Sequence, residues 1–398
     1  MPASPAPSIV RPLIGGVAAL AVAMGVGRFA YTPILPAMQQ DVGFGSDVAG
    51  LLASLNHLGY FLGAFAAAIP GAGSRRLALR FCLLTSLGTT AAMAYGDSVV
   101  LWAVLRFVSG LASAGIFVLA VSTLLETITQ HGRPGLSGYL FSGVGLGIIV
   151  SGLVVLLLGD AFVWRFDWLG LGLVSALLVL PAWLWVGDRG PENTGPAPGP
   201  QPAPRRFPLP ALYLAYFCEG GGYIVSGTFL VAIVQGLPDL AGLSELAWVV
   251  VGLAAAPSCL LWAWAAQRLG TVGALITAHL VQAFGILLPL MSGGALAVIG
   301  GAMLFGGTFM GITTLAVSFA GAIAPARRAR AVGFATASFG LGQIIGPFVA
   351  GAMAERSGNF DEALMMAAAV VAVGAVLLAL GAAWARSRAA APVPDPEG

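Results

Sequence analysis

Residues 11–37 read RPLIGGVAALAVAMGVGRFAYTPILPA, an apolar run whose only charged side chains are Arg11 and Arg28. A helix needs about 20 mostly apolar residues to cross the hydrocarbon core of a bilayer, and this run is long enough. Ala21-Val22-Ala23 is similar to the cleavage region of a signal peptide, but the apolar run continues to Ile34, too far for such a peptide. We therefore predict that residues 11–37 form a first membrane span.

Eleven further apolar runs follow the first one along the chain. Their ranges are 48–70, 77–95, 98–125, 135–158, 164–187, 210–236, 245–266, 271–291, 294–323, 330–355 and 361–386. The chain of 398 residues is 58% hydrophobic and 9% charged, whereas a soluble domain carries about 25% charged residues. A bilayer removes the need for a charged surface, because the outer face of the protein can be as apolar as its core. We predict an all-α integral membrane protein with twelve transmembrane helices.

Positive charges are distributed unevenly between the predicted loops. Fourteen of the 18 arginines fall near the two termini and in the loops after the even-numbered spans, whereas two, Arg165 and Arg356, fall on the opposite side. Cytoplasmic loops are enriched in basic residues, so we expect a multi-pass protein of the inner (cytoplasmic) membrane with both termini in the cytoplasm. The charges lie in short loops rather than on one basic face, which gives no indication of nucleic-acid binding.

Several chemistries have no support in the sequence. The chain contains no lysine, and a nucleotide-binding P-loop needs one, so we expect neither ATP-driven pumping nor a cofactor. Cys82, Cys218 and Cys259 lie in apolar runs at wide spacings, which predicts free thiols and no metal site. Motifs such as H-E-x-x-H and G-x-S-x-G are absent from the sequence, and we do not expect an enzyme.

A Pro- and Gly-rich segment divides the chain near its middle. Residues 188–209 read DRGPENTGPAPGPQPAPRRFPL, a composition that does not hold a regular element. We predict a cytoplasmic linker here. It would join an N-terminal six-helix bundle, residues 1–187, to a C-terminal six-helix bundle with a short tail, residues 210–398.

The two halves repeat each other's sequence. Residues 138–147 match residues 333–342, and residues 25–28 match residues 220–223, in both cases 195 residues later. A parallel repeat of this kind predicts two bundles related by a pseudo-two-fold axis along the membrane normal. That architecture is typical of secondary transporters that bind their substrate between the halves, near the midplane of the bilayer.

Four short motifs resemble the major facilitator superfamily. Residues 106–112, RFVSGLA, resemble its R-x-x-x-G element, and residues 342–351, GQIIGPFVAG, resemble the G-x-x-x-G-P-x-x-x-G element associated with antiporters. Residues 25–33, GVGRFAYTP, and 219–223, EGGGY, resemble a poorly characterised bacterial branch of the superfamily. The resemblance covers essentially the whole chain, and it implies a monomeric transporter whose first and fourth spans line the substrate cavity.

Two arginines and a histidine lie at similar depth inside the predicted spans. A charge at the bilayer centre costs about 2.5–3.5 kcal/mol on insertion scales, so Arg28 and Arg106 are functional candidates. With no acid at that depth, the two side chains and His57 could hold an anionic substrate through bidentate hydrogen bonds. The alternative is that the arginines pair with helix-end carbonyls or with a loop acid such as Asp41.

Glu219 is the only acid deep inside a predicted span. A carboxyl group in an apolar environment is more stable neutral than charged, which suits a group that gains and loses a proton. The alternative is an assembly role, in which Glu219 pairs with an arginine. His279 and Gln282 share a helix face, but the ninth span is peripheral in the superfamily, and we expect both to be structural.

The candidate residues form three groups. The predicted substrate-binding residues are Arg28, Tyr31, Asn56, His57, Tyr60, Arg106, Tyr223 and Gln343, and the predicted proton-coupling residues are Glu219 and Arg106. The loops after spans 2 and 8 resemble parts of the superfamily's gating loops, and Glu126 is expected to pair with a loop arginine such as Arg75 or Arg327. The predicted gating residues are Arg75, Arg76, Glu126, Arg268, Gly346 and Pro347.

We predict a secondary active transporter of a small organic solute that works by alternating access. Its partners would be the lipid bilayer, a small-molecule substrate, with an organic anion favoured, and protons. The alternative is a drug/proton antiporter that exports lipophilic or cationic compounds, in which Glu219 contacts the cation among aromatic side chains. A non-transporting membrane sensor is a third hypothesis, and the lack of any soluble signalling domain in the sequence argues against it.

Overall fold

The computed structural model describes residues 9–68, 74–133, 135–159, 163–187, 207–237, 239–292 and 294–390, and every regular element in these ranges is helical. The predicted linker 188–209 lies outside the described residues except for its last three, of which Leu209 already begins a helix. Gly73 of the predicted gating loop also lies outside them.

Helices account for almost all of the described chain. In order, they are α1 (Val10–Leu20), the π-helix η1 (Ala21–Phe29), α2 (Tyr31–Val42), α3 (Ser46–Ala68), α4 (Arg75–Ala92), α5 (Val99–Gln130), α6 (Leu136–Leu158), α7 (Trp164–Trp185), α8 (Leu209–Gln235), the 3₁₀ turn η2 (Ala241–Leu243), α9 (Ser244–Met291), α10 (Ala295–Ile323), the 3₁₀ turn η3 (Pro325–Arg327), α11 (Arg328–Ser357) and α12 (Asp361–Ala390).

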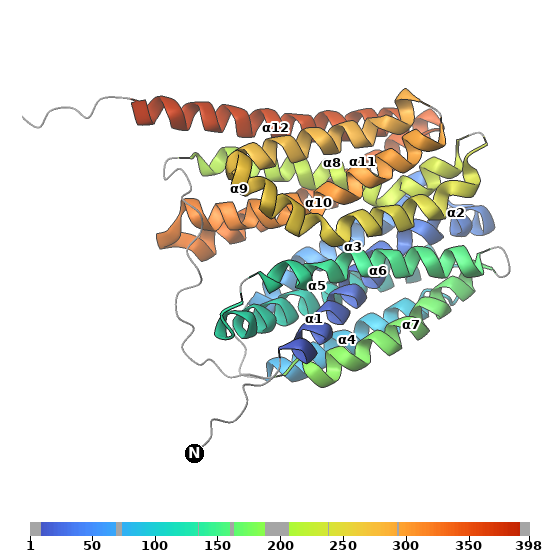
Figure 1. The fold of residues 1–398 in the computed structure, drawn as a ribbon. Helices are drawn as coiled ribbons and strands as arrows, with labels where there is room; N and C mark the ends of the chain where they lie inside the picture. Colours follow the sequence, from blue (N-terminus) through green and yellow to red (C-terminus); the bar gives the residue numbers. More distant parts are fainter. Residues whose placement is uncertain are drawn as a thin grey trace, which may run out of the picture.

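Long helices run side by side along one direction, with α8 to α12 above and α1 and α4 to α7 below in Figure 1. The starts of α1, α4, α8 and α11 and the end of α12 lie together on the left of that view. We call this side the arginine-rich end and the other side the acidic end. The arginine-rich end carries Arg75, Arg76, Arg80, Arg327, Arg328, Arg330, Arg386 and Arg388, and the acidic end carries Asp41, Asp47, Asp97 and Asp361.

Within the described ranges, ten helices are long and apolar enough to cross a membrane. The difference from the predicted twelve has two local causes. Helix α9 covers both predicted spans 245–266 and 271–291, which meet at Gly270, where the backbone is not helical (φ 71°, ψ 158°). Helix α4, at the place of the predicted span 77–95, has only 18 residues, and three of them are arginines.

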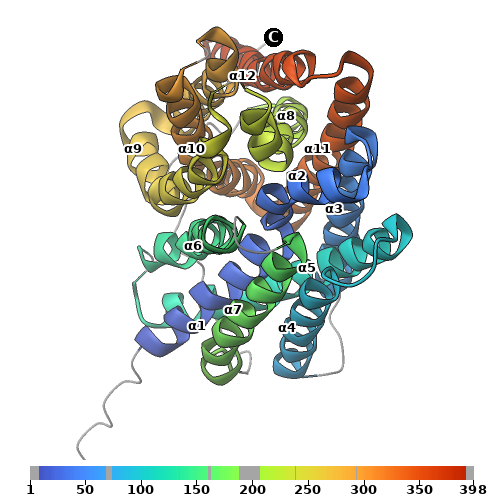
Figure 2. The same cartoon turned by 90° about the vertical axis from the view of Figure 1, so that its right-hand side faces the viewer.

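Helices from the two sides of the predicted linker contact each other directly. Figure 2 views the molecule from the acidic end, and α3 packs along α11 while α6 packs along α9. The Thr32 Oγ1 donates to the Gly227 carbonyl at 2.5 Å, and the Trp248 Nε1 donates to the Ser151 Oγ at 3.1 Å. Such buried hydrogen bonds fix helices that have no hydrophobic drive to associate in lipid.

Close glycine contacts bring the first segment of each half against its neighbour. A Cβ added to Gly25 would overlap the backbone of Gly147 on α6, and a Cβ added to Gly342 on α11 would overlap the Phe217 carbonyl of α8. Gly147 and Gly342 are the same position of the sequence repeat, 195 residues apart. Small residues let backbones approach in this way, so the repeat in sequence corresponds to a repeat in packing.

Candidate functional site

The candidate site begins at the π-helix η1, where the Gly27 carbonyl oxygen accepts hydrogen bonds from three side chains. The donors are Asn56 Nδ2 at 3.3 Å, Arg106 Nη1 at 3.4 Å and Ser109 Oγ at 2.9 Å. Asn56 comes from α3, and the other two come from α5. A π-helix is rare and often marks a functional site, and these donors compensate for its irregular backbone.

Arg106 is occupied with backbone groups. Its Nη2 also donates to the Arg28 carbonyl at 3.2 Å, and its guanidinium lies 4.7 Å from the centre of the Tyr31 ring. Asn56 Nδ2 in turn donates to the Arg106 carbonyl at 2.8 Å. These contacts correspond to the alternative in which the arginine pairs with carbonyl oxygens. Roles for Arg106 and Asn56 in substrate binding stay predictions.

Arg28 has a different environment from Arg106. Its side chain is only 4% exposed, its Nη2 lies 3.0 Å from His57 Nδ1, and its guanidinium lies 4.3 Å from the centre of the Tyr60 ring. Since a guanidinium can only donate, His57 Nδ1 accepts this hydrogen bond. Arg28 makes no salt bridge with any described carboxylate, and its Nε has no hydrogen-bond partner.

The loop acid considered as a partner for Arg28 is engaged elsewhere. Asp41 accepts hydrogen bonds from Trp164 Nε1 at 2.8 Å and from Arg165 Nη1 at 3.2 Å. Arg165 also bonds to Asp97. This network ties the start of α7 to the acidic end. Arg28 is left as a buried cation in contact with an imidazole nitrogen, a thioether sulfur, aromatic rings and the Tyr60 hydroxyl.

Tyr223 occupies the position of the second half that corresponds to Arg28. Its ring stacks on Phe309, with centroids 5.6 Å apart, and on Phe339, with centroids 5.4 Å apart. Its hydroxyl accepts a hydrogen bond from Gln343 Nε2. The predicted substrate residues Tyr223 and Gln343 therefore lie together at the junction of α8, α10 and α11. Tyr31, by contrast, donates to the Ala49 carbonyl at 3.3 Å.

Glu219 is completely buried on α8 and has an unexpected neighbour. His279 Nε2 lies 3.9 Å from Glu219 Oε2. Gln282 also interacts with the carboxyl group, although neither carboxyl oxygen makes a well-aligned hydrogen bond to a described residue. Leaving a buried polar group unpaired costs about 1–3 kcal/mol. The alternative in which Glu219 pairs with an arginine is not seen among the described residues.

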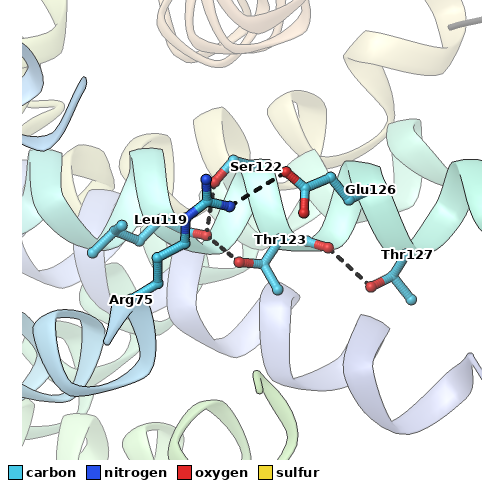
Figure 3. Close-up of polar contacts among 6 residues, drawn as sticks. All are labelled: Arg75, Leu119, Ser122, Thr123, Glu126 and Thr127. Atoms are coloured by element: carbon cyan, nitrogen blue, oxygen red, sulfur yellow. Dashed lines mark hydrogen bonds and ion pairs between the residues drawn. The ribbon is translucent and has the colours of Figure 1, made fainter. Parts of the chain in front are cut away.

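The gating candidates lie mainly at the arginine-rich end. Figure 3 shows Glu126 on α5 paired with Arg75 on α4 at 3.4 Å, which is one of the two pairings expected. In the same view, the hydroxyls of Thr123 and Thr127 donate to carbonyls one turn earlier, those of Leu119 and Thr123. The role of this pair as a gate stays a prediction.

The remaining gating candidates contact neighbouring helices or side chains. Arg268 lies 4.8 Å over the Trp264 ring. A Cβ on Gly346 would overlap the Gly221 carbonyl of α8. The Pro347 carbonyl faces Gly50 on α3 so closely that a Cβ there would overlap it. Arg76 is the second residue of α4, directly after Arg75.

Comparison with protein families identifies the chain. Residues 20–379 match the family described as uncharacterised MFS-type transporter YbfB. The chain belongs to this family. It is therefore a multi-pass membrane transporter and not an enzyme. The expected membership of the major facilitator superfamily (MFS) is confirmed.

Two curated transporters are similar in sequence to this MFS transporter. The human monocarboxylate transporter 11 is 26% identical over 340 residues, which cover 77% of this chain and 68% of the relative. The quinolone resistance transporter of Acinetobacter baumannii is 30% identical over 159 residues. That match covers 38% of this chain and 36% of the relative.

Solved structures share the fold of the transporter. A D-xylose-proton symporter has a TM-score of 0.74 at 13% identity, covering 93% of this chain and 97% of that one. The nucleoside transporter NupG has a TM-score of 0.66 at 15% identity, covering 96% of this chain and all (100%) of that one. At such low identity the similarity shows the fold alone.

Sequence reasoning missed two side chains of this region. Ser109 makes the shortest of the three bonds to the Gly27 carbonyl, and His279 faces Glu219 although its span was expected to be peripheral. A serine three residues after Arg106 lies on the same helix face, so that spacing could have indicated Ser109. No local pattern could have indicated His279, because its position depends on how α9 packs against α8.

Proposed function

We propose that this MFS transporter carries a small organic anion together with protons across the cytoplasmic membrane, by alternating access between its two halves. The observation that carries this proposal is the buried guanidinium of Arg28, which has no carboxylate partner among the described residues.

A buried cation without a counter-charge is costly, so it is retained where a ligand supplies the charge. An organic carboxylate fits the planar fork of a guanidinium. His57 and Tyr60 hold the group in place, one through a hydrogen bond and the other through its ring face. A relative named monocarboxylate transporter 11 agrees with an anionic substrate.

Protons are the coupling ion in this proposal, and Glu219 is their carrier. The carboxyl group is fully buried and has no arginine partner among the described residues, so it is stable when neutral. One solved structure with the same fold is a proton symporter by name. Protonated Glu219 would allow the loaded transporter to change state without moving a bare charge through an apolar region.

The proposal also includes an arrangement of twelve membrane spans, two more than the ten long apolar helices described above. Counting α9 as two spans on either side of Gly270, and α4 as a short span, gives twelve spans in two six-helix bundles. The concentration of arginine at the end where the described chain starts and finishes supports cytoplasmic termini. We propose a monomer as the working unit.

A drug/proton antiporter is the second candidate, and the stacked rings of Tyr223, Phe309 and Phe339 favour it. Aromatic faces bind lipophilic cations through cation–π contacts. A quinolone resistance transporter is among the relatives. In this mechanism Glu219 rather than Arg28 would bind the exported compound.

Ligand-dependent thermal stability separates the two candidates. Purified full-length protein is heated with benzoate, with lactate and with tetraphenylphosphonium, in wild type, Arg28→Gln and Arg28→Lys. A ligand at about 100 times its Kd stabilises by about 2.7 kcal/mol. We expect an anion to stabilise wild type, to have no effect on Arg28→Gln, and to keep a reduced effect on Arg28→Lys, which retains charge without the fork.

The controls make this test specific. Arg28 has no acid partner, so its removal leaves no orphaned buried carboxylate, and Arg28→Gln should fold. Arg388→Gln, at the end of α12, removes an arginine far along the chain from the site. Equal stabilisation of wild type and Arg28→Gln by an anion would exclude the anion site. Stabilisation by tetraphenylphosphonium that disappears in Glu219→Gln would favour the antiporter instead.

A further inference from the structure

Glu219, His279 and Gln282 form a closed polar cluster between α8 and the second part of α9. Their exposed fractions are 0%, 2% and 0%. The side chain of Gln282 interacts with the Glu219 carboxyl group, and the Ala215 carbonyl interacts with the His279 ring. None of these contacts is a well-aligned hydrogen bond, so both carboxyl oxygens of Glu219, the Nε2 of His279 and both amide atoms of Gln282 stay without such a partner among the described residues. So many unpaired polar atoms in one buried place call for a ligand that satisfies them.

The tautomer of His279 follows from its other nitrogen. His279 Nδ1 lies 2.8 Å from the Leu275 carbonyl oxygen. A carbonyl can only accept, so Nδ1 carries a hydrogen. In the neutral ring Nε2 is then a bare acceptor, and it faces Glu219 Oε2 at 3.9 Å. This arrangement is ready to receive a proton on the line between the two atoms. The Ala215 carbonyl also interacts with the ring, and it can accept a hydrogen bond from Nε2 once that nitrogen is protonated.

Gly374 of α12 makes room for the imidazole ring. A Cβ added there would lie 2.9 Å from His279 Cδ2 and 3.3 Å from His279 Nε2, and 3.1 Å from the Ala215 carbonyl oxygen. The ring edge that faces Glu219 therefore packs directly against the backbone of α12. Its position is fixed from two sides, by Leu275 and by Gly374.

We propose that His279 and Gln282 complete a proton-binding site with Glu219, in which one proton is held between Glu219 Oε2 and His279 Nε2. The inference rests on the proton coupling proposed above and adds its second partner. His279 is therefore a proton-binding residue beside the carboxyl group. Gln282 supplies an amide that can donate to the carboxylate or accept from the acid.

The proton count of the site is simple. With one proton bound, the pair is either a neutral acid beside a neutral imidazole or a carboxylate beside an imidazolium, and both forms have no net charge. Release of the proton leaves a carboxylate beside a neutral imidazole. At 3.9 Å the two atoms need a bridging water or a movement of about 1 Å to share the proton through a hydrogen bond.

Few other titratable groups act on this pair. Tyr216, Cys218 and Tyr223 of α8 interact electrostatically with Glu219. On α12, the residue that packs against the imidazole ring is Gly374, which has no titratable side chain. Within the described ranges no group of three or more His, Cys, Asp or Glu side chains could hold a metal ion. The chemistry of the cluster therefore fits a proton.

Infrared difference spectroscopy tests the proposal without any substrate. Purified full-length protein in lipid nanodiscs is titrated with acid, and the carbonyl band of protonated Glu219 is assigned by its loss in Glu219→Gln. We expect His279→Gln and His279→Asn to change the frequency of this band and to move its pH midpoint by about one unit or more. His131→Gln should leave both unchanged.

His131 is the matched control because its Nδ1 lies 2.7 Å from the carbonyl oxygen of Thr127, four residues earlier, as in His279. If the His279 variants do not fold, Gly374→Ala displaces the ring while all three polar side chains remain. An unchanged band and midpoint in every folded variant of His279 and Gly374 would overturn the proposal.

Transport measurements separate this inference from the proposed function. Proton-driven uptake of radiolabelled lactate is followed in vesicles at several pH values. If the wild type takes up no lactate but the carbonyl band of Glu219 still depends on His279, lactate transport is contradicted and the proton site is supported. A second outcome is that Glu219→Gln abolishes proton-driven uptake while the His279 variants keep the pH profile of the wild type. This result would support the proposed transport function and contradict the role of His279.

Discussion

Residues 25–28 and 220–223 occupy the same position of the sequence repeat, yet they differ in backbone and in charge. The first segment lies in the π-helix η1 and ends in Arg28, whereas the second lies in the regular helix α8 and ends in Tyr223. Both segments lie against a glycine of the corresponding neighbour, Gly147 in one half and Gly342 in the other. The packing is repeated and the chemistry is not.

The difference shows how one half can specialise without losing the shared packing. In the first half, donors from α3 and α5 converge on the Gly27 carbonyl and hold an irregular turn next to a buried cation. In the second half, the buried charge is an acid, Glu219, one turn before Tyr223, and the helix stays regular. A transporter that needs an anion site and a proton site can thus place one in each half.

The largest effect is expected where the shared packing is broken. A Cβ on Gly25 overlaps the backbone of Gly147, so neither partner can yield by rotating a side chain. We expect Gly25→Ala to destabilise the protein by about 3 kcal/mol or more, with loss of monodisperse protein in detergent and a lower melting temperature.

The second half offers a control for this change at Gly221, one residue after the position that corresponds to Gly25. A Cβ added to Gly221 would meet backbone atoms of Gly342, the nearest being its carbonyl oxygen at an ordinary contact distance of 3.6 Å. Gly221→Ala should therefore be tolerated, since alanine also favours the helix by about 1 kcal/mol. Equal stability of Gly25→Ala and Gly221→Ala would show that η1 and α6 do not depend on this close approach.

A smaller effect is expected where the two halves differ in hydrogen bonding. Asn56 donates to the Gly27 and Arg106 carbonyls, whereas Gln343 donates to the single hydroxyl of Tyr223. We expect Asn56→Leu to cost about 2 kcal/mol and Gln343→Leu about 1 kcal/mol, measured by unfolding in mixed micelles. The reverse order would mean that η1 does not need the Asn56 contacts.

The sequence contains the signal for the spans and for the charged candidates, because apolar length and isolated charges are local properties. The region of α9 was predicted as two separate spans, 245–266 and 271–291. The short gap between them contains Gly270, the residue whose backbone is not helical in the structure. The π-helix η1 could not be predicted, because its supporting donors Asn56, Arg106 and Ser109 lie 29 to 82 residues away. The same holds for His279, which reaches Glu219 only through tertiary packing.

The smallest effect on stability is expected at the arginine-rich end. Arg75 and Glu126 are 58% and 33% exposed, and both belong to the first half. Exposed pairs contribute about 0.2–1 kcal/mol and are weakened by salt, so Glu126→Gln should change the melting temperature little, and less at high salt. A pair within one half also cannot by itself hold the two halves together.

The two ends of the molecule can then be compared as gates. At the acidic end the Ser46 backbone N–H, at the start of α3, donates to Glu355 Oε2 of α11 at 2.7 Å, which joins the two halves. Removing the negative charge of the acceptor weakens this contact and should change the rate of alternation. We expect Glu355→Gln to alter lactate exchange in vesicles more than Glu126→Gln, by about threefold or more for a loss of about 1 kcal/mol. A larger change in Glu126→Gln would place the controlling gate at the arginine-rich end, because only a contact that differs between the two states of the transporter can affect their exchange.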